Sequence, residues 1–468
     1  QAEPLDLGHA DAAARVARWD AALDQARAAN PQRALGLVKA RAALTMLAIH
    51  SGAQCDQDGA AFQRLTNAWT HFADWSVAAG LRQASTVEAS TVEASEVEAG
   101  AADVPGLFVL GLGKLGGHDL NYSSDVDLIS FFDAKRTEAA LGWEAGAGTL
   151  RAGRLLKGLN AVLAPPGGPR VWRTDWRLRP DAPSSPLAQT LSAGQQFFLR
   201  RSEPWNRLAM LKARPVAGDL AAAKHFLRSL EGYLWRRALD FAQLDDIAAL
   251  KARINAEHPR LAGQRAQGAV TSLATLDGWN VKLGHGGIRE IEFIVNALQL
   301  IWGGRHASLR VTETLVALDK LQTIGLLDGT ATGDLRAAYI GFRLLENRLQ
   351  LHADGHTHVV PADLEQRAHL AICAGHGSWA AYGDWLTAHR RNVAAHFAAT
   401  FDTLLGSRNV AATAGTHAPT QPTVQAPDQS PRQLARQSSG SSAGQSPSTS
   451  HGPAKDVGPA ANDALTIP

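Results

Sequence analysis

Two acidic residues that follow a glycine-rich turn are the feature of this sequence best suited to chemistry. Asp125 and Asp127 open the apolar segment 125–132, and the turn before them carries Gly111, Gly113 and Lys114. If 125–132 is a strand, the two aspartates share one face about 7 Å apart, because alternate residues of a strand point the same way. Carboxylates held that close repel each other, and Mg²⁺ with bound phosphates is the usual partner of such a pair. We therefore predict a magnesium–phosphate site, in which the glycines let backbone N–H groups approach the phosphates.

Glycine turns of this kind also occur in dinucleotide-binding folds and in P-loops. The first fold requires a helix after the glycines, whereas this chain continues to acidic residues and a strand. The second requires Ser or Thr after the lysine, and here Lys114 is followed by Leu115. The glycine turn, Ser124 and the two aspartates instead resemble the DNA polymerase β-type nucleotidyltransferases. The alternative is a glycine-rich hairpin with two solvated acids.

A third carboxylate is expected from the segment 171–180, since two acids seldom suffice for two metal ions. As a strand, this segment places Arg173, Asp175, Arg177 and Arg179 on one face and an apolar set including Trp172 on the other. An acid among arginines suits a metal-bound polyphosphate. The alternative is a surface strand with salt-bridged arginines.

Two further basic segments remain open to more than one interpretation. Lys212 and Arg214 follow the third acid, and a helix there would place Arg207 and Arg214 partly on one face, as a phosphate-binding or a merely exposed basic surface. The segment 280–293 is a glycine turn that leads into a helix beside Lys282. Such a turn binds anions or simply caps the helix.

A zinc site is a weaker alternative for three closely spaced histidines. They are His352, His356 and His358. No cysteine accompanies them, and they do not share a helical frame, so a turn with hydrogen-bonded histidines is the better interpretation.

The bulk composition excludes several classes of protein. The chain has 468 residues and a formal net charge of +2, so it has neither the basic excess of a nucleic-acid binder nor an acidic tail. Two distant cysteines, Cys55 and Cys373, suggest no disulfide framework and favour a reduced cytoplasmic setting. No apolar run reaches the length of about 18 residues that a membrane span needs. The start at Gln1, without Met or a signal peptide, suggests a fragment or a processed product.

The hydrophobic pattern divides the chain into four regions. Residues 1–104 are expected to be helical, with Phe62, Leu65, Trp69 and Phe72 at helical spacing and a five-residue repeat forming an exposed linker over 83–101. Residues 105–218 mix strands and helices and carry the acids. Residues 219–407 are almost wholly helical. Residues 408–468 are rich in Ser, Pro, Gln and Gly and are expected to be disordered.

Taken together, these motifs resemble the glutamate–ammonia ligase adenylyltransferase family, whose members add AMP to glutamine synthetase and remove it. The resemblance runs from about residue 105 to 361 and rests on five segments: 111–128, 175–180, 205–219, and the pair 282–293 and 346–350. The last pair is similar to the unit that the family uses for removing AMP, and a second catalytic unit has no counterpart here. Asp119 stands where the family usually has Glu, and His356 where it usually has Gln.

The resemblance implies an α+β fold, with a polymerase β-type domain and its small mixed sheet flanked by a helical amino-terminal region and a carboxy-terminal helical bundle. It implies a magnesium-dependent nucleotidyltransferase that removes AMP from a tyrosine of glutamine synthetase by phosphorolysis to ADP. Asp125, Asp127 and Asp175 would be the catalytic metal ligands. The residues expected to bind the nucleotide and phosphate are Gly111, Gly113, Lys114, Ser124, Arg177, Arg179, Lys212 and Arg214.

The expected cofactor is Mg²⁺, and ATP, ADP and phosphate would be substrates or products. Glutamine synthetase, and in addition the PII signal protein, would be partners. Neither nucleic acid nor a membrane is expected to bind, and the location would be cytoplasmic. Two alternatives remain: adenylylation by ATP at the same site, or a truncated regulatory module that binds glutamine synthetase or PII without catalysis.

Overall fold

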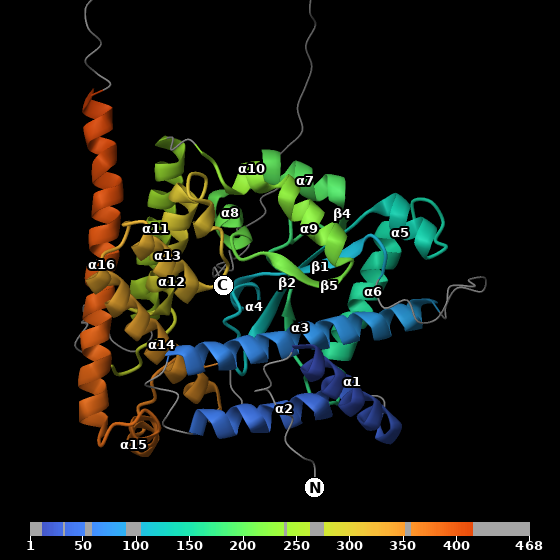
Figure 1. Ribbon diagram of the computed structural model, residues 1–468, viewed down its shortest axis with the longest axis horizontal. Helices are drawn as coiled ribbons and strands as arrows, with labels where there is room; N and C mark the ends of the chain where they lie inside the picture. The colour runs from blue at the N-terminus through green and yellow to red at the C-terminus, as the bar shows by residue number, and fades with distance from the viewer. Residues whose placement is uncertain are drawn as a thin grey trace, which may run out of the picture. The chain divides into compact units, whose positions relative to one another are not determined.

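The computed structural model describes residues 12–30, 33–51, 59–89, 104–237, 241–262, 276–351 and 357–414. It confirms the α+β class: helices surround one small mixed sheet (Figure 1). No helix in these ranges is long and apolar enough to cross a bilayer. The strands are β1 (Leu107–Gly111), β2 (Asp125–Phe132), β3 (Arg173–Asp175), β4 (Ala188–Thr190) and β5 (Arg214–Gly218).

The sheet is built around β2, its longest strand. The order is β3-β2-β1-β5, and β4 pairs with β2 beyond β3. β1 is antiparallel to β2 and to β5, whereas β3 and β4 are both parallel to β2. β1 and β2 are buried on both faces, which explains why their sequences are nearly continuous apolar runs.

Each face of the sheet has its own core. Leu107 and Val109 pack with tryptophans and leucines of the amino-terminal helices, while Phe108 and Leu110 pack with aromatic residues on the opposite face. The helices inside this region are α4 (Gly113–Gly116), α5 (Ala134–Ala140), α6 (Gly148–Leu163), α7 (Leu191–Arg200), α8 (Pro204–Met210), α9 (Leu220–Ser229) and α10 (Glu231–Leu234).

Three helices precede the sheet: α1 (Ala12–Ala29), α2 (Ala34–Ser51) and α3 (Gly59–Ala89). α3 lies along the sheet, with α1 and α2 on its other side (Figure 1). The predicted helical stripe is confirmed, since Phe62, Leu65, Trp69 and Phe72 are all buried. The expected start of a linker at residue 83 is wrong, because α3 continues through the first repeat to Ala89. Residues 90–103 lie outside the described residues.

The remaining helices form the predicted helical region. They are α11 (Phe241–Ala262), α12 (Ile288–Trp302), α13 (Thr314–Thr323), α14 (Gly329–Leu351), α15 (Leu364–Cys373) and α16 (Trp379–Ala414), with a short 3-10 turn, η2, at Ala307–Leu309. α12, α13 and α14 pack against one another (Figure 1). α16 continues past residue 408, where the tail was expected to begin, and residues 415–468 lie outside the described residues.

Candidate active site

The register of β2 and β3 brings the three predicted acids to one face of the sheet. Asp127 pairs with Asp175 and Asp125 with Arg173 across the parallel strands. Register partners project to the same side, on strands about 4.8 Å apart. Asp125 lies two residues before Asp127 on β2, so it shares that face.

Two arginines of the β3 segment face two of these carboxylates. Arg173 Nε donates to Asp125 Oδ1, and Arg173 also donates to the carbonyl of Ser123. Arg177 Nε donates to Asp175 Oδ2 over 2.9 Å. This hydrogen bond and the charge of Asp175 raise the pKa of Arg177 above its usual value. Arg177 thus contacts Asp175 from just beyond the end of β3, and Arg173 is an additional cation at the acids.

Asp127 is the acid in the most unfavourable environment. Its side chain is buried, and burial followed by the negative charge of Asp175 raises its pKa to about 7. The nearby positive charges of Lys282 and Lys114 oppose this shift. The three carboxylates therefore form a cluster whose buried member, Asp127, would be stabilised in its charged form by a bound cation.

Magnesium fits the donor chemistry of this cluster. All three donors are carboxylate oxygens, which are the ligands that Mg²⁺ prefers. Among the described residues, however, no group of three His, Cys, Asp or Glu is already arranged to enclose an ion. Here Asp125 and Asp175 interact with arginines instead.

The glycine turn lies directly against the acids. Gly113 has φ +52°, and a Cβ built on it would overlap the carboxylate of Asp127. The backbone N–H of Leu112 donates to the carbonyl of Asp127 over 2.9 Å. Gly111 is close-packed instead: its Cβ would lie 2.7 Å from Val216 Cγ2. As expected, the chain leads from the glycine turn to a strand, β2, and the only helix between β1 and β2 is the single turn α4.

Other residues predicted to bind phosphate have different contacts. Ser124 Oγ donates to the carbonyl of Asp125 over 3.0 Å. Lys212 Nζ lies 3.0 Å from Thr314 Oγ1. Lys114 Nζ lies 2.6 Å from Glu346 Oε1 of α14. The two lysine ends thus face residues of the helical region.

Arg179 and Arg214 form their hydrogen bonds with groups other than the three aspartates of β2 and β3, although the charge of Asp175 acts on Arg179. Strand β3 ends at Asp175 and the chain turns, so the predicted alternation stops there and Arg179 donates to the carbonyls of Trp176, Ala182 and Ser185. The expected helix that includes Arg214 is also wrong, because α8 ends at Met210 and Arg214 begins β5. Arg214 forms a two-pronged ion pair with Asp74 of α3, at 2.8 Å for each bond.

Helix α14 holds the loop that leads from the glycine turn to Asp125. Asn347 Oδ1 accepts from the N–H of Tyr122, and Gln350 Oε1 accepts from the N–H of Ser123, each at 3.1 Å. Arg343 donates to the carbonyl of Asp119 and to the side chain of Asn121. The Asp119 carboxylate accepts from Tyr339 and Thr314 at 2.9 and 3.2 Å. Sequence patterns did not reveal this contact, because its partners are between 195 and 227 residues apart.

Glu346 is the centre of this contact. Besides Lys114, His358 Nδ1 lies 2.8 Å from its Oε1 and Arg343 Nε 3.2 Å from its Oε2. Burial alone would raise the pKa of Glu346, but the charges of Lys114 and Arg343 and the hydrogen bond with His358 hold it well below its usual range. Burial lowers the pKa of His358, so His358 is a hydrogen-bond partner of Glu346. His352 and His356 lie outside the described residues.

The glycine turn before α12 confirms the capping interpretation of that segment. Gly287 is the N-cap of α12, so the turn does cap the helix. The same turn carries Lys282, whose charge acts on Asp127, Lys114 and His358. Lys282 thus belongs electrostatically to the site, which the sequence did not show.

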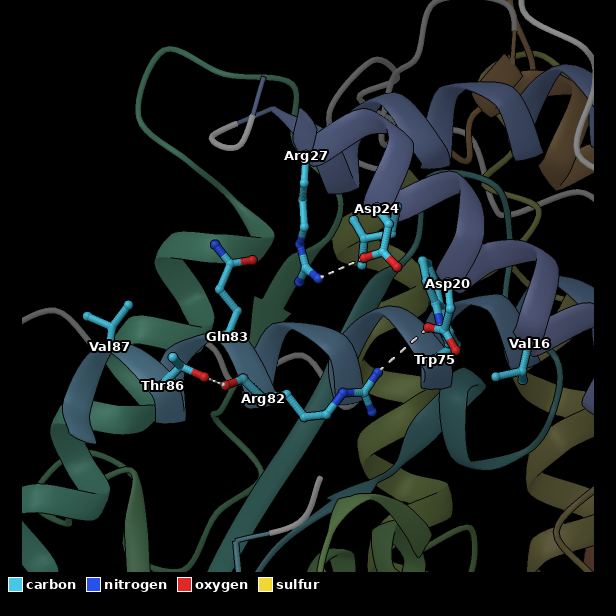
Figure 2. Close-up of a pocket in the computed structure, with 10 residues that line it drawn as sticks. Val16, Asp20, Asp24, Arg27, Trp75, Arg82, Gln83, Thr86 and Val87 are labelled. Atoms are coloured by element: carbon cyan, nitrogen blue, oxygen red, sulfur yellow. Dashed lines mark hydrogen bonds and ion pairs between the residues drawn. The ribbon is translucent and has the colours of Figure 1, made fainter. Parts of the chain in front are cut away.

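A separate hollow of about 800 Å³ lies between α1 and α3 (Figure 2). Trp75 and Leu23 line it, and Asp20 and Asp24 face Arg82 and Arg27 at 3.9 and 3.5 Å. None of the predicted site residues lines it, so the acids of β2 and β3 remain the candidate active site.

Comparison with known proteins gives consistent matches over most of the chain. The glutamate-ammonia ligase adenylyltransferase family matches residues 7–229, and the GlnD PII-uridylyltransferase family matches residues 248–401.

A bifunctional glutamine synthetase adenylyltransferase/adenylyl-removing enzyme of Mesorhizobium japonicum is 40% identical over 299 residues, which are 64% of this chain and 29% of the relative. A protein of the same name from Xanthomonas campestris is 42% identical over 294 residues, which are 62% of this chain and 30% of the relative. The protein of the same name from Rhodopseudomonas palustris is 36% identical over 372 residues, which are 79% of this chain and 36% of the relative. The chain thus spans about a third of the length of these curated relatives.

Proposed function

Because this chain belongs to the glutamate-ammonia ligase adenylyltransferase family, we propose that it removes AMP from adenylylated glutamine synthetase by phosphorolysis. The observation that carries the proposal is the common face of Asp125, Asp127 and Asp175, with Gly113 against Asp127. The direction of the reaction is supported by segments 282–293 and 346–350, which resemble the AMP-removing unit of the family. The charge of Lys282 in the first segment acts on Asp127, and Glu346 in the second pairs with Lys114 of the glycine turn.

The proposed reaction is an in-line displacement at the AMP phosphorus. An oxygen of hydrogen phosphate attacks this phosphorus and forms the P–O–P bond of ADP. The bond from phosphorus to the tyrosine oxygen breaks, its electron pair stays on the phenol oxygen, and the proton of hydrogen phosphate ends there. Magnesium held by Asp125, Asp127 and Asp175 would stabilise charge on the attacking and leaving oxygens.

The chain's own residues orient the substrate in this scheme. Gly113 lets the Asp127 carboxylate lie directly against the backbone of the glycine turn, since a Cβ at this position would overlap that carboxylate. Arg173 and Arg177 hold Asp125 and Asp175 in position and offset the negative charge of the phosphates. Lys114 and Lys282 add positive potential at Asp127.

We also propose partners and a location. Glutamine synthetase is the protein substrate, as the names of the relatives indicate for those proteins. PII is a second partner, on the basis of the family that matches residues 248–401 and is named for PII. A cytoplasmic location agrees with an exposed, unpaired Cys373.

Adenylylation by ATP is the second candidate, because the relatives are named for both activities. The two directions are separated by supplying the purified chain with adenylylated glutamine synthetase plus phosphate, or with unmodified glutamine synthetase plus ATP. Phosphate-dependent release of ADP supports removal. Incorporation of AMP from ATP without ADP release in the first arm overturns that direction, and inactivity in both arms favours a non-catalytic module.

A further inference from the structure

A polar hollow of about 510 Å³ opens beside the first residue of β2. Its lining residues come from α2, from the loop before β2 and from the segment that precedes β3; they are Lys39, Ser123, Ser124, Ala164, Pro165, Gly167, Gly168, Arg170, Val171, Trp172 and Arg173. Every charged residue in this lining is basic. The hollow therefore has the electrostatic character of an anion-binding site.

The hollow is in direct contact with the predicted active site. Ser124 precedes Asp125 in the chain, and Arg173 is the register partner of Asp125 on β3. Arg173 also donates to Asp125 and to the carbonyl of Ser123, so one guanidinium lies between the first acid and the hollow. An anion in the hollow would therefore lie next to the reacting centre.

The three basic residues of the hollow differ in how firmly their side chains are held. Lys39 Nζ lies 4.1 Å from the centre of the Trp172 ring and donates to the carbonyl of Val171, so its position is fixed by the wall. Arg173 is fixed by Asp125. Arg170 is exposed at the rim. It can change its conformation to meet a ligand, and its removal should disturb the fold least.

The lining also includes glycines that let a small ligand approach the backbone. Gly167 has φ +68°, a conformation that favours glycine, and a Cβ on it would meet nothing within 4 Å. Gly168 follows it, and the hydroxyls of Ser123 and Ser124 lie among the other lining residues. Hydroxyl groups, exposed backbone and guanidinium groups are the usual partners of phosphate oxygens.

We propose that this hollow is the subsite for the inorganic oxyanion of the reaction, with Arg170 and Arg173 as its guanidinium groups and Lys39 as a fixed positive charge. In AMP removal the oxyanion is the attacking phosphate, and in the reverse chemistry with ATP it is the leaving pyrophosphate. Both present the same tetrahedral, multiply charged oxygens. The assignment rests on the proposed nucleotidyl transfer and adds a binding site for the small co-substrate.

The test measures phosphate binding and turnover separately in a charge series at Arg170. Phosphate and pyrophosphate are titrated into the full chain by calorimetry, for the wild type and for Arg170→Lys, Arg170→Gln and Arg170→Glu. The KM for phosphate and the KM for adenylylated glutamine synthetase are then measured for the same proteins. Arg154→Gln is the matched control, since Arg154 is also exposed, on α6, and does not line the hollow.

The expected result is a graded loss of oxyanion affinity. Arg170→Gln should weaken phosphate binding about tenfold and Arg170→Glu further, because one charge-assisted contact is lost and then replaced by repulsion. Arg170→Lys should retain most of the affinity, and the KM for the protein substrate should stay unchanged. Pyrophosphate could instead bind more tightly than phosphate and lose its affinity in the same series of variants. The ligand of the hollow would then be the pyrophosphate that leaves when ATP donates AMP.

Two results would overturn the assignment. Equal phosphate affinity in Arg170→Glu and in the Arg154→Gln control would remove the hollow as an oxyanion site. A raised KM for glutamine synthetase alone would assign it to an acidic segment of the protein substrate instead. Calorimetry needs no turnover, so a chain that binds phosphate here but releases no ADP would contradict the proposed function and leave the subsite standing.

Discussion

Lys114 Nζ lies 2.6 Å from Glu346 Oε1, and both side chains are almost completely removed from solvent. The pair joins the glycine turn to helix α14, across 232 residues of sequence. Three more residues of α14 bind the loop 119–123 that leads to Asp125. The position of the acids therefore depends on the helical region as well as on the sheet.

Replacing Glu346 by Gln is expected to destabilise the protein by about 3–5 kcal/mol, because it leaves buried cations without their carboxylate. Lys114 and Arg343 would both lose the charge of this partner. Urea denaturation measures the change, and Glu365→Gln at an exposed position of α15 is the control. A loss below about 1 kcal/mol would show that the ion pair contributes little.

Replacing Asp127 by Asn is expected to lower AMP transfer at least about a hundredfold and to leave the folded state as stable or more stable. Stability should not fall, because the charge of Asp175 and burial both disfavour an ionised Asp127. Turnover assays and thermal unfolding check the two parts of the prediction, with exposed Glu144→Gln as the control. Retained activity would remove the acids from the mechanism.

Replacing Gly113 by Ala is expected to abolish turnover and to cost about 1–2 kcal/mol of stability, because φ is +52° there. The added Cβ would also overlap the Asp127 carboxylate. The matched control is Gly153→Ala in α6, where a Cβ meets nothing within 4 Å. The control should be stabilised by up to about 1 kcal/mol. If both variants behave alike, the close approach at Gly113 has no role.

His118 is expected to make the protein sensitive to acid. Burial, followed by the charges of Arg214 and His71, lowers its pKa to about 4. Since the unfolded chain has the ordinary, higher value, it binds more protons as the pH falls from about 6.5 to about 4, and stability is lost over that window.

The test is His118→Asn, because asparagine tolerates the φ of 54° at this position. Wild type and variant should respond alike near neutral pH. At about pH 5 the variant should have lost about 1 kcal/mol less than the wild type, a value reduced for the partial exposure of His118. Thermal unfolding at several pH values measures the difference, and a pH-independent difference would contradict this origin of acid sensitivity.

Several features of the site followed from the sequence because they depend on neighbouring residues. The strand that begins at Asp125 and the glycine at 113 are local, since alternation and turn geometry act over a few residues. The face of Asp175 was also predictable, although the strand that carries it is only three residues long. Arg173 was placed on that face by the same alternation, but its ion pair with Asp125 required the register of two strands.

The partners of the basic residues were decided by the tertiary structure alone. Arg179 and Arg214 follow the acids closely in sequence, yet the chain turns after Asp175, and α3 brings Asp74 to Arg214. Lys282, Glu346 and His358 are far from the acids in sequence and reach the site only because the helical region contacts the glycine turn and the loop 119–123. Local patterns determine which residues can carry charge and which backbone can turn. The buried contacts between distant segments determine which charge each of them meets, because burial makes those pairings strong and specific.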